Sequence, residues 1–287
     1  MSHGFKAYDM KDMCRKAMFS RKIVIAALLG VAALVLAAGC GGNDPAAWLT
    51  DCGEAINAYA QDDGYLHFVQ EKEYRLETLQ GDFEQQLRVE GDIIFPASET
   101  YEYSETATST QEQEQQENTF SYLTLDGGEN AYVMGERLSA ELGVLGWVYY
   151  TPQPGQNRYF DYAGSIAKLT GVAADPEWLG YEDLGGERCA HIRYSVTGQE
   201  LIELRLQEDP TLAEQLQGVD LSEVMGELVV ELWIREADRL PQQVDMTQSV
   251  SMAESASSTT HMLFLFSGYG EVPPLRIEAP AFYNEAV

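Results

Sequence analysis

The sequence predicts an α+β protein in which a long, curved antiparallel sheet carries helices over one face. From Tyr65 onward, apolar residues mostly alternate with polar ones, which is the period of a half-buried strand. After a first helix, helical patterns interrupt these strands at only two places. Sequential strands with segregated helices are typical of the α+β class.

The first predicted element is a helix over residues 45–60. Asn43 or Asp44 can cap its first turn, and Pro45 suits the first helical position. A polar stretch at 62–64 ends it. Its apolar face, at helical spacing, consists of Trp48, Leu49, Cys52, Ile56 and Tyr59.

Four stretches predict strands by their alternation: EQQLRVEGDIIF, ENTFSYLTLDGGENAYVMG, CAHIRYSV and ELVVELWIREADRLPQQVDMTQ. In the second, Gly127 and Gly128 predict a hairpin turn between two short strands. In the fourth, residues 237–239 turn the chain back. The last predicted strand, HMLFLF, is apolar at successive positions, which indicates a central strand covered on both faces.

Helices are predicted near Tyr162–Leu169 and from about Thr211 to Met225, the latter between a preceding Asp-Pro and Gly226. The segment Ser104–Glu117 is polar, low in complexity and without apolar period, and we interpret it as a mobile loop between two strands. A simple solvated turn is favoured over a gate that covers a cavity.

The N-terminal segment predicts an exported protein. An apolar run from Ile23 to Ala38 follows Arg21 and Lys22, which is the layout of a signal peptide covering residues 1–39. The run is shorter than the roughly 20 residues of a membrane-spanning helix, although an uncleaved signal anchor is the alternative. Because the charges lie far from Met1, Met18 is the expected true start.

The end of this run, Leu36–Cys40, resembles the lipobox of bacterial lipoproteins, in which the Cys receives a lipid. Cys40 is therefore the predicted lipid anchor, residues 40–44 the tether, and 45–287 a single domain. The expected location is extracytoplasmic, at the outer or the cytoplasmic membrane. The chain carries a formal charge of −28, which excludes nucleic acid as a partner and requires a covalent anchor at an anionic membrane.

Two further cysteines, Cys52 and Cys189, form an even pair in an exported chain and predict a disulfide, with two unpaired buried thiols as the alternative. No metal site or cofactor is expected, because the sequence has no CxxC, HExxH, P-loop, GxGxxG or GxSxG motif. We therefore predict that the protein is not an enzyme, with a hydrolase that uses a pair of its many carboxylates as the alternative. His191 and His261 are expected on strands as polar or half-buried groups.

Several segments in order resemble the LolA/LppX-LprG-like bacterial lipoprotein superfamily. They are the lipobox followed at once by a helix, the segment Leu184–Ile192, the hairpin of Val230–Ile234 and Leu240–Val244, and the tail from Phe264 to Pro280. The resemblance implies an incomplete β-barrel of about eleven strands with helices covering the concave face. It also implies that acyl chains or lipids are carried between sheet and helices.

The first functional hypothesis is a lipid or lipoprotein carrier that binds an acyl chain in an apolar cavity. Each of the candidate lining residues could equally belong to an ordinary filled core. The alternative is an envelope sensor or protein-interaction module without lipid cargo, for which Trp147, Tyr149 and Tyr150 could form an aromatic patch. The candidate lining residues are Leu228, Val230, Leu232, Ile234, Met262, Phe264 and Phe266.

Overall fold

The computed structural model describes residues 44–285, apart from 63, 96–97, 110–113, 127–128, 137–142, 144, 152–161, 209–225, 253–255 and 274–276. The predicted signal peptide, Cys40, the Gly127–Gly128 turn and the predicted helix at Thr211–Met225 lie outside these residues.

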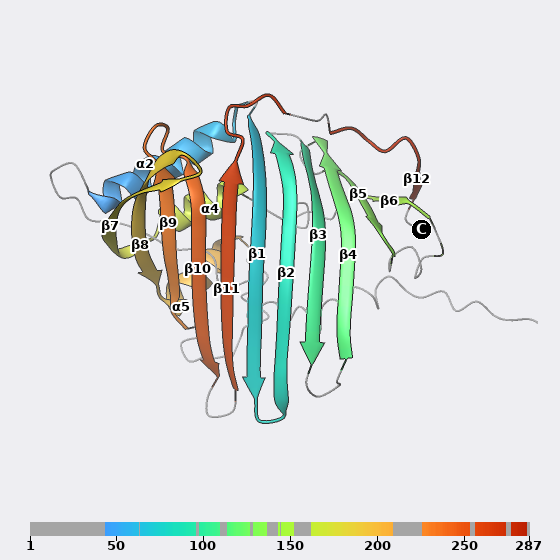
Figure 1. The fold of residues 1–287 in the computed structure, drawn as a ribbon, viewed down its shortest axis with the longest axis horizontal. Helices are drawn as coiled ribbons and strands as arrows, with labels where there is room; N and C mark the ends of the chain where they lie inside the picture. Colours follow the sequence, from blue (N-terminus) through green and yellow to red (C-terminus); the bar gives the residue numbers. More distant parts are fainter. Residues whose placement is uncertain are drawn as a thin grey trace, which may run out of the picture.

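The described strands form one twelve-stranded open sheet, in the order β12-β6-β5-β4-β3-β2-β1-β11-β10-β9-β8-β7 (Figure 1). The strands are β1 (Tyr65–Thr78), β2 (Gly81–Ile94), β3 (Ser98–Ser109), β4 (Glu114–Leu125), β5 (Asn130–Gly135), β6 (Trp147–Tyr150), β7 (Ala174–Leu184), β8 (Glu187–Val196), β9 (Leu228–Arg235), β10 (Pro241–Met252), β11 (Ala256–Ser267) and β12 (Tyr283–Glu285).

The pairing of β1 with β11 joins the first half of the sheet to the second. These two strands pair antiparallel from His67 opposite Ser267 to Thr78 opposite Ala256. The sheet is mixed, because β12 runs parallel to β6. The prediction of an antiparallel sheet was therefore wrong at this edge, where the short last strand β12 is added beside β6.

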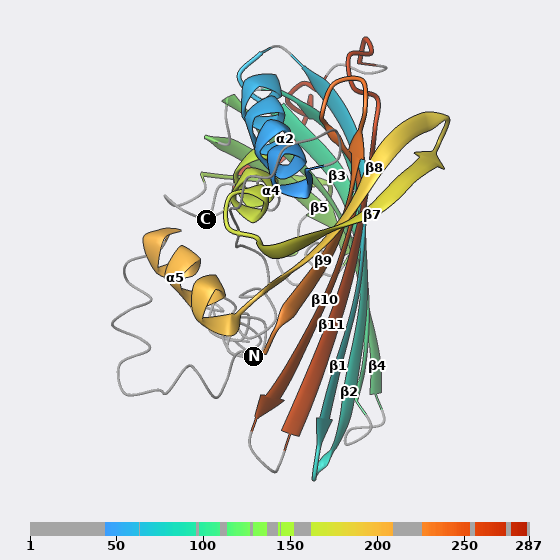
Figure 2. The same cartoon turned by 90° about the vertical axis from the view of Figure 1, so that its left-hand side faces the viewer.

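Three described helices, α2 (Pro45–Tyr59), α4 (Tyr162–Thr170) and α5 (Gly198–Glu208), lie on one side of the sheet (Figure 2). The helix predicted over residues 45–60 is confirmed, and Asp44 is its cap, since its carboxylate accepts a hydrogen bond from the Ala46 N–H at 3.0 Å. Its predicted apolar face is buried at Trp48, Leu49, Cys52 and Ile56.

Helix α4 confirms the prediction near Tyr162–Leu169 and packs closely against α2. The contact is made at Gly53, where a Cβ atom would clash with Oγ1 of the buried Thr170. The absence of a side chain at Gly53 therefore lets the two helices approach each other.

Helix α5 was not predicted, although its sequence carries a start signal. Thr197 and Glu200 form a capping box, in which the Thr197 N–H donates to the Glu200 carboxylate at 3.0 Å and the Glu200 N–H donates to the Thr197 hydroxyl at 3.4 Å. The Thr-x-x-Glu spacing could have indicated the helix.

The prediction of a mobile loop over Ser104–Glu117 was wrong. Strands β3 and β4 occupy most of this segment and pair without interruption from Glu99 opposite Thr124 to Ser109 opposite Glu114. The ladder is made by main-chain hydrogen bonds, which polar residues supply as well as apolar ones. A strand beyond the apolar core therefore needs no apolar period.

The stretch HMLFLF lies in the central strand β11, as predicted, but it is not covered on both faces. Met262, Phe264 and Phe266 are buried toward the helices, whereas Leu265 is 39% exposed on the opposite face. Among the described residues, no second layer lies over Leu265. Strand β12 follows β11, so β11 is not the last strand.

The predicted disulfide is not formed, since Cys52 and Cys189 are both free and buried, as in the alternative. Cys52 belongs to the main core beneath α2, together with Ala190. Because successive strand side chains point to opposite faces, Cys189 points away from the face that carries Ala190. The sheet thus separates the two sulfur atoms.

Candidate functional site

The face of the sheet turned toward α2 and α4, here called the inner face, contains all the side chains predicted to line a cavity. Each is buried, and together they belong to one apolar cluster drawn from β9 and β11. The alternation of the strands places them there, because every second residue faces the helices. They are Leu228, Val230, Leu232, Ile234, Met262, Phe264 and Phe266.

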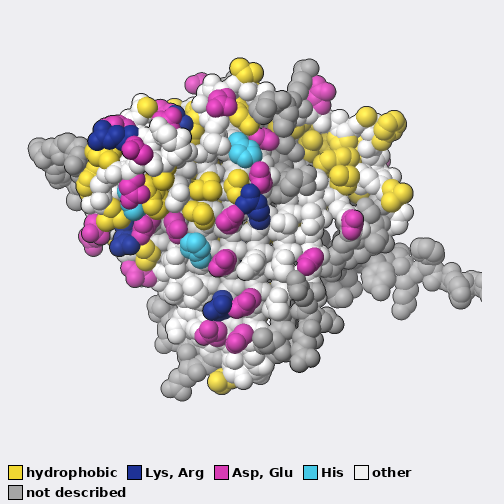
Figure 3. Space-filling model, viewed as in Figure 1, with side chains coloured by type: hydrophobic (Ala, Val, Ile, Leu, Met, Phe, Trp, Pro, Cys, Tyr) yellow, Lys and Arg dark blue, Asp and Glu magenta, His cyan; other side chains and the backbone are white. Residues whose placement is uncertain are grey.

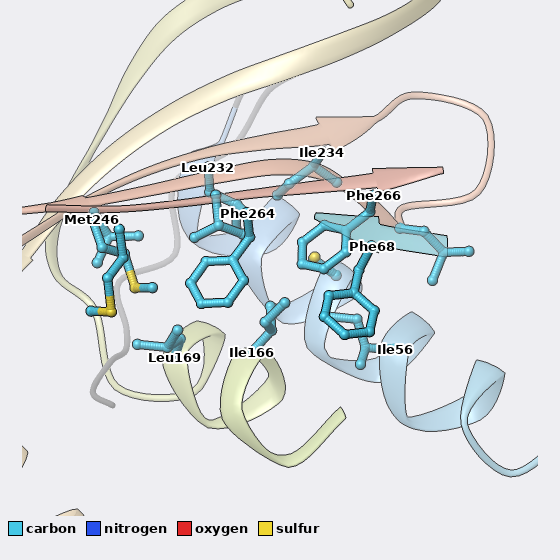
Figure 4. Close-up of a cluster of buried hydrophobic side chains, with 14 of the residues drawn as sticks. Ile56, Phe68, Ile166, Leu169, Leu232, Ile234, Met246, Phe264 and Phe266 are labelled. Carbon is cyan, nitrogen blue, oxygen red and sulfur yellow. The ribbon is translucent and has the colours of Figure 1, made fainter. Parts of the chain in front are cut away.

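The neighbouring strands and the helices complete this apolar surface. Figure 4 shows Ile166 and Leu169 of α4 and Ile56 of α2 facing Phe264, Phe266 and Leu232 across the core. Sequence reasoning assigned Val244 and Met246 to a returning strand but did not include them in the site. Phe68 of β1 was also missed, although it belongs to the same apolar cluster. All of these side chains are buried.

Farther along the same strands, the inner face becomes polar while staying buried. On β10, Gln248 is 1% exposed and lies opposite Thr260 of β11, which lies opposite Tyr74 of β1. Among the described residues, neither amide atom of Gln248 has a hydrogen-bond partner. A polar group buried in this way is uncommon and requires an explanation.

A buried lysine lies beside these groups. Lys72 is 8% exposed, sits opposite Met262 of β11, and has its Nζ atom 5.8 Å from the centre of the Tyr74 ring. Burial lowers the pKa of Lys72, and the negative charge of Glu105 partly opposes that shift. The Glu105 carboxylate accepts hydrogen bonds from the Gln85 amide and, at 2.9 Å, from the Tyr103 hydroxyl.

We call Lys72, Tyr74, Glu105, Gln248 and Thr260 the polar patch. None of its residues was predicted as a site. The signal was present in the alternation, because all five occupy positions of β1, β3, β10 and β11 that share a face with core residues. A polar residue at a core position is the feature that could have identified it.

The opposite face, here called the outer face, carries a charged cluster around His191. Its Nδ1 lies 2.9 Å from Glu182 Oε1 and its Nε2 lies 2.9 Å from Glu231 Oε2, while its ring stacks on Trp233. His191 was expected as an ordinary polar strand residue, but it is buried between two carboxylates. His261 is half-buried and lies 2.9 Å from Asp245, in line with expectation.

The predicted aromatic patch of Trp147, Tyr149 and Tyr150 does not form as one surface. Tyr150 packs against the main core, and its hydroxyl donates to that of Tyr122 at 3.3 Å. Trp147 and Tyr149 pack on the other face, against Leu123, Tyr132 and Ile277. Hydrophobic side chains gather there in Figure 3. Alternation along β6 separates the three residues.

In the part of the chain that the structure describes, no group of His, Cys, Asp and Glu side chains is arranged to hold a metal ion. Within the same residues, none of the helices has the length and apolar character needed to cross a bilayer.

No family model and no curated protein matches the chain. Solved structures similar to it include LprF from Mycobacterium bovis, at 14% identity and a TM-score of 0.47, covering 85% of this chain and 100% of that one. The lipoprotein LppX from Mycobacterium tuberculosis is 12% identical over 81% of this chain and 97% of that one, with a TM-score of 0.42.

A putative outer membrane lipoprotein-sorting protein domain from Vibrio parahaemolyticus is 10% identical, with a TM-score of 0.25, and covers 80% of this chain and 95% of that one. LppX, one of the proteins of the group that the sequence segments resemble, is among these solved structures.

Proposed function

We propose that this protein is an extracytoplasmic lipoprotein, anchored through Cys40, whose domain of residues 45–287 binds a lipid or acyl chain and performs no catalysis. The ligand lies between the concave face of the sheet and the covering helices α2 and α4. The observation that carries this proposal is the continuous apolar inner face, to which β1, β9, β10 and β11 all contribute buried side chains. Burying a methylene group there contributes about 0.8 kcal/mol.

When the acyl chain binds, its contacts with the apolar side chains replace contacts that these side chains otherwise make with one another. Phe264 and Phe266 stack with 6.2 Å between ring centres, and α4 closes over them through Ile166 and Leu169 (Figure 4). Binding therefore requires α2 and α4 to shift relative to the sheet. Because Gly53 holds these helices close together, we expect them to shift as a pair.

The anchor accounts for how such a protein reaches its ligand. Asp44 caps α2 only a few residues after Cys40, so the body remains close to the membrane. The acidic body would be repelled by anionic lipids without a covalent anchor. A short tether and an apolar face together suit the exchange of acyl chains at a bilayer surface.

The test is mass spectrometry of organic extracts from residues 41–287, exported and purified as a soluble protein. A lipid present in stoichiometric amount would support the carrier and identify its class. A stable protein that carries no lipid, and takes up none when vesicles are supplied, would contradict the proposal.

An envelope sensor or protein-interaction module is the second candidate, and one observation favours it. At the β6–β12 edge, Leu145 is 92% and Phe282 is 89% exposed. Phe282 directly precedes Tyr283, which forms a cluster of rings with Tyr132 and Tyr149. An exposed apolar group of this kind suits a protein partner. Cross-linking from position 282 in cells would trap such a partner.

A further inference from the structure

The inner face divides into an apolar part and a buried polar part along the same strands. On β11, Phe264 and Met262 are followed by Thr260, and on β10 Met246 is followed by Gln248. The polar patch therefore borders the proposed hydrocarbon site directly. A surface that changes from apolar to polar in this way matches an amphiphile.

Gln248 is the strongest indication of a ligand. Its amide can donate two hydrogen bonds and accept two, yet among the described residues it makes none while being 1% exposed. Burying an amide without hydrogen bonds lowers the stability of the fold, unless another molecule supplies the hydrogen-bond partners. The position of Gln248 opposite Leu228 and Thr260 places the amide on the inner face, with the other residues of the polar patch.

The charges of the patch indicate what kind of polar group fits. Lys72 brings one positive charge, and Glu105 brings one negative charge from β3. Only Leu87 of β2 stands between them in the strand register. Because the two charges offset each other, the patch offers little net attraction to an anionic head group. The remaining groups, an amide and hydroxyls, both donate and accept hydrogen bonds.

We propose that the polar patch binds the uncharged, oxygen-rich polar group of an amphiphile whose hydrocarbon chain lies on the apolar inner face. Hydroxyl and ester oxygens accept from Lys72 and Gln248, and ligand hydroxyls donate to Gln248. This inference rests on the proposed function, which supplies the hydrocarbon site, and adds the class and orientation of the ligand.

The test uses the full chain, purified in detergent with its natural N-terminal processing. Native mass spectrometry measures the occupancy by three probes: 1-monooleoylglycerol, 1-octadecene and 1-oleoyl lysophosphatidic acid. The variants are Gln248→Leu and Lys72→Met, and Gln243→Leu on the outer face of the same strand is the matched control. Equal melting temperatures establish that the variants fold.

We expect monooleoylglycerol to bind at least tenfold more tightly than octadecene, because it makes hydrogen bonds that the hydrocarbon lacks. Gln248→Leu and Lys72→Met should each remove about tenfold from monooleoylglycerol binding and leave octadecene binding unchanged, whereas Gln243→Leu should change neither. If Gln248→Leu does not fold, Lys72→Met alone is compared with the wild-type protein for binding of the two probes.

Three results would overturn the inference while leaving the proposed function in place. They are equal affinity for octadecene and monooleoylglycerol, equal losses for both probes in the variants, and tighter binding of the lysophosphatidic acid. If none of the three probes binds the wild-type protein, the proposed function fails, and the inference with it.

Discussion

The environment of an individual side chain in this protein depends on which side of the sheet it lies. Cys52 lies on α2 and is buried in the core between that helix and the inner face, whereas Cys189 points to the outer face. Burial raises the pKa of both thiols, that of Cys189 to about 11, with Asp238 and Asp51 adding to the effect at Cys52. Neither thiol is therefore a ready thiolate nucleophile.

We expect Cys52 and Cys189 to resist iodoacetamide in the folded protein and both to react in denaturant without any reductant. Mass spectrometry of the two peptides measures the modification at each site. Modification that appears only after a reductant is added would establish the disulfide and contradict the structure.

The His191 cluster links stability to pH at the residue scale. Hydrogen bonds from Trp233 and His191 lower the pKa of Glu182 below its ordinary 4.5. At Glu231, burial acts to raise the pKa, but hydrogen bonds from Arg193 and His191 outweigh it and the pKa is lowered. Because the folded-state pKa values are depressed, these groups stabilise the fold fully above the unfolded pKa. The contribution is lost as pH falls through the folded values.

We expect Glu182→Gln to lower the free energy of unfolding by at most about 1 kcal/mol at pH 6, since Glu182 is half-exposed. The difference from wild type should shrink as pH falls below the ordinary carboxyl pKa of 4.5. Urea unfolding at a series of pH values measures this. Glu54→Gln, an exposed position on α2, is the control. A difference independent of pH would contradict the assignment.

At the scale of elements, the pair α2 and α4 determines how the helices cover the inner face. Helix propensity alone predicts that Gly53→Ala stabilises α2 by up to about 1 kcal/mol. The close approach of Thr170 predicts the opposite, since a Cβ atom at position 53 clashes with its buried Oγ1. Whether Gly53→Ala raises or lowers the free energy of unfolding therefore shows whether α2 and α4 pack closely at this point.

We expect Gly53→Ala to destabilise the protein by about 1–3 kcal/mol, and Gly53→Ala combined with Thr170→Ala to recover part of that loss. Urea unfolding of the two single variants and the double variant gives the coupling. A more stable Gly53→Ala variant would mean that α2 and α4 do not approach at this point.

Strands β3 and β4 show at the same scale why sequence reasoning failed over Ser104–Glu117. The pattern there is polar because this part of the hairpin lies beyond the main apolar core. Tyr103 and Tyr122 lie in the part of the hairpin that reaches the core, and both are buried. Periodicity reports burial, and it gives no information about main-chain pairing where burial is weak. Helix α5 was missed for another reason, since only its capping box marks it.

At the scale of the whole molecule, the proposed function requires the acidic domain to be held at a membrane. We expect cells given a labelled fatty acid to incorporate the label into the wild-type protein and not into Cys40→Ala. Cys14→Ala, which alters a cysteine before the predicted true start, should keep the label and is the matched control. Equal labelling of Cys40→Ala would exclude this anchor.

The sequence by itself determined the local features of this protein. It predicted the helix over residues 45–60, the inward-facing residues of β9, and the seven apolar residues that share the inner face, because alternation and capping are properties of neighbouring residues. Only the tertiary structure decided which strands lie together. The pairing of β1 with β11 places Tyr74 opposite Thr260, which lies opposite Gln248, and places Lys72 opposite Met262. The sheet separates Cys52 from Cys189. Such contacts depend on strand order and register across long separations, which no local pattern encodes.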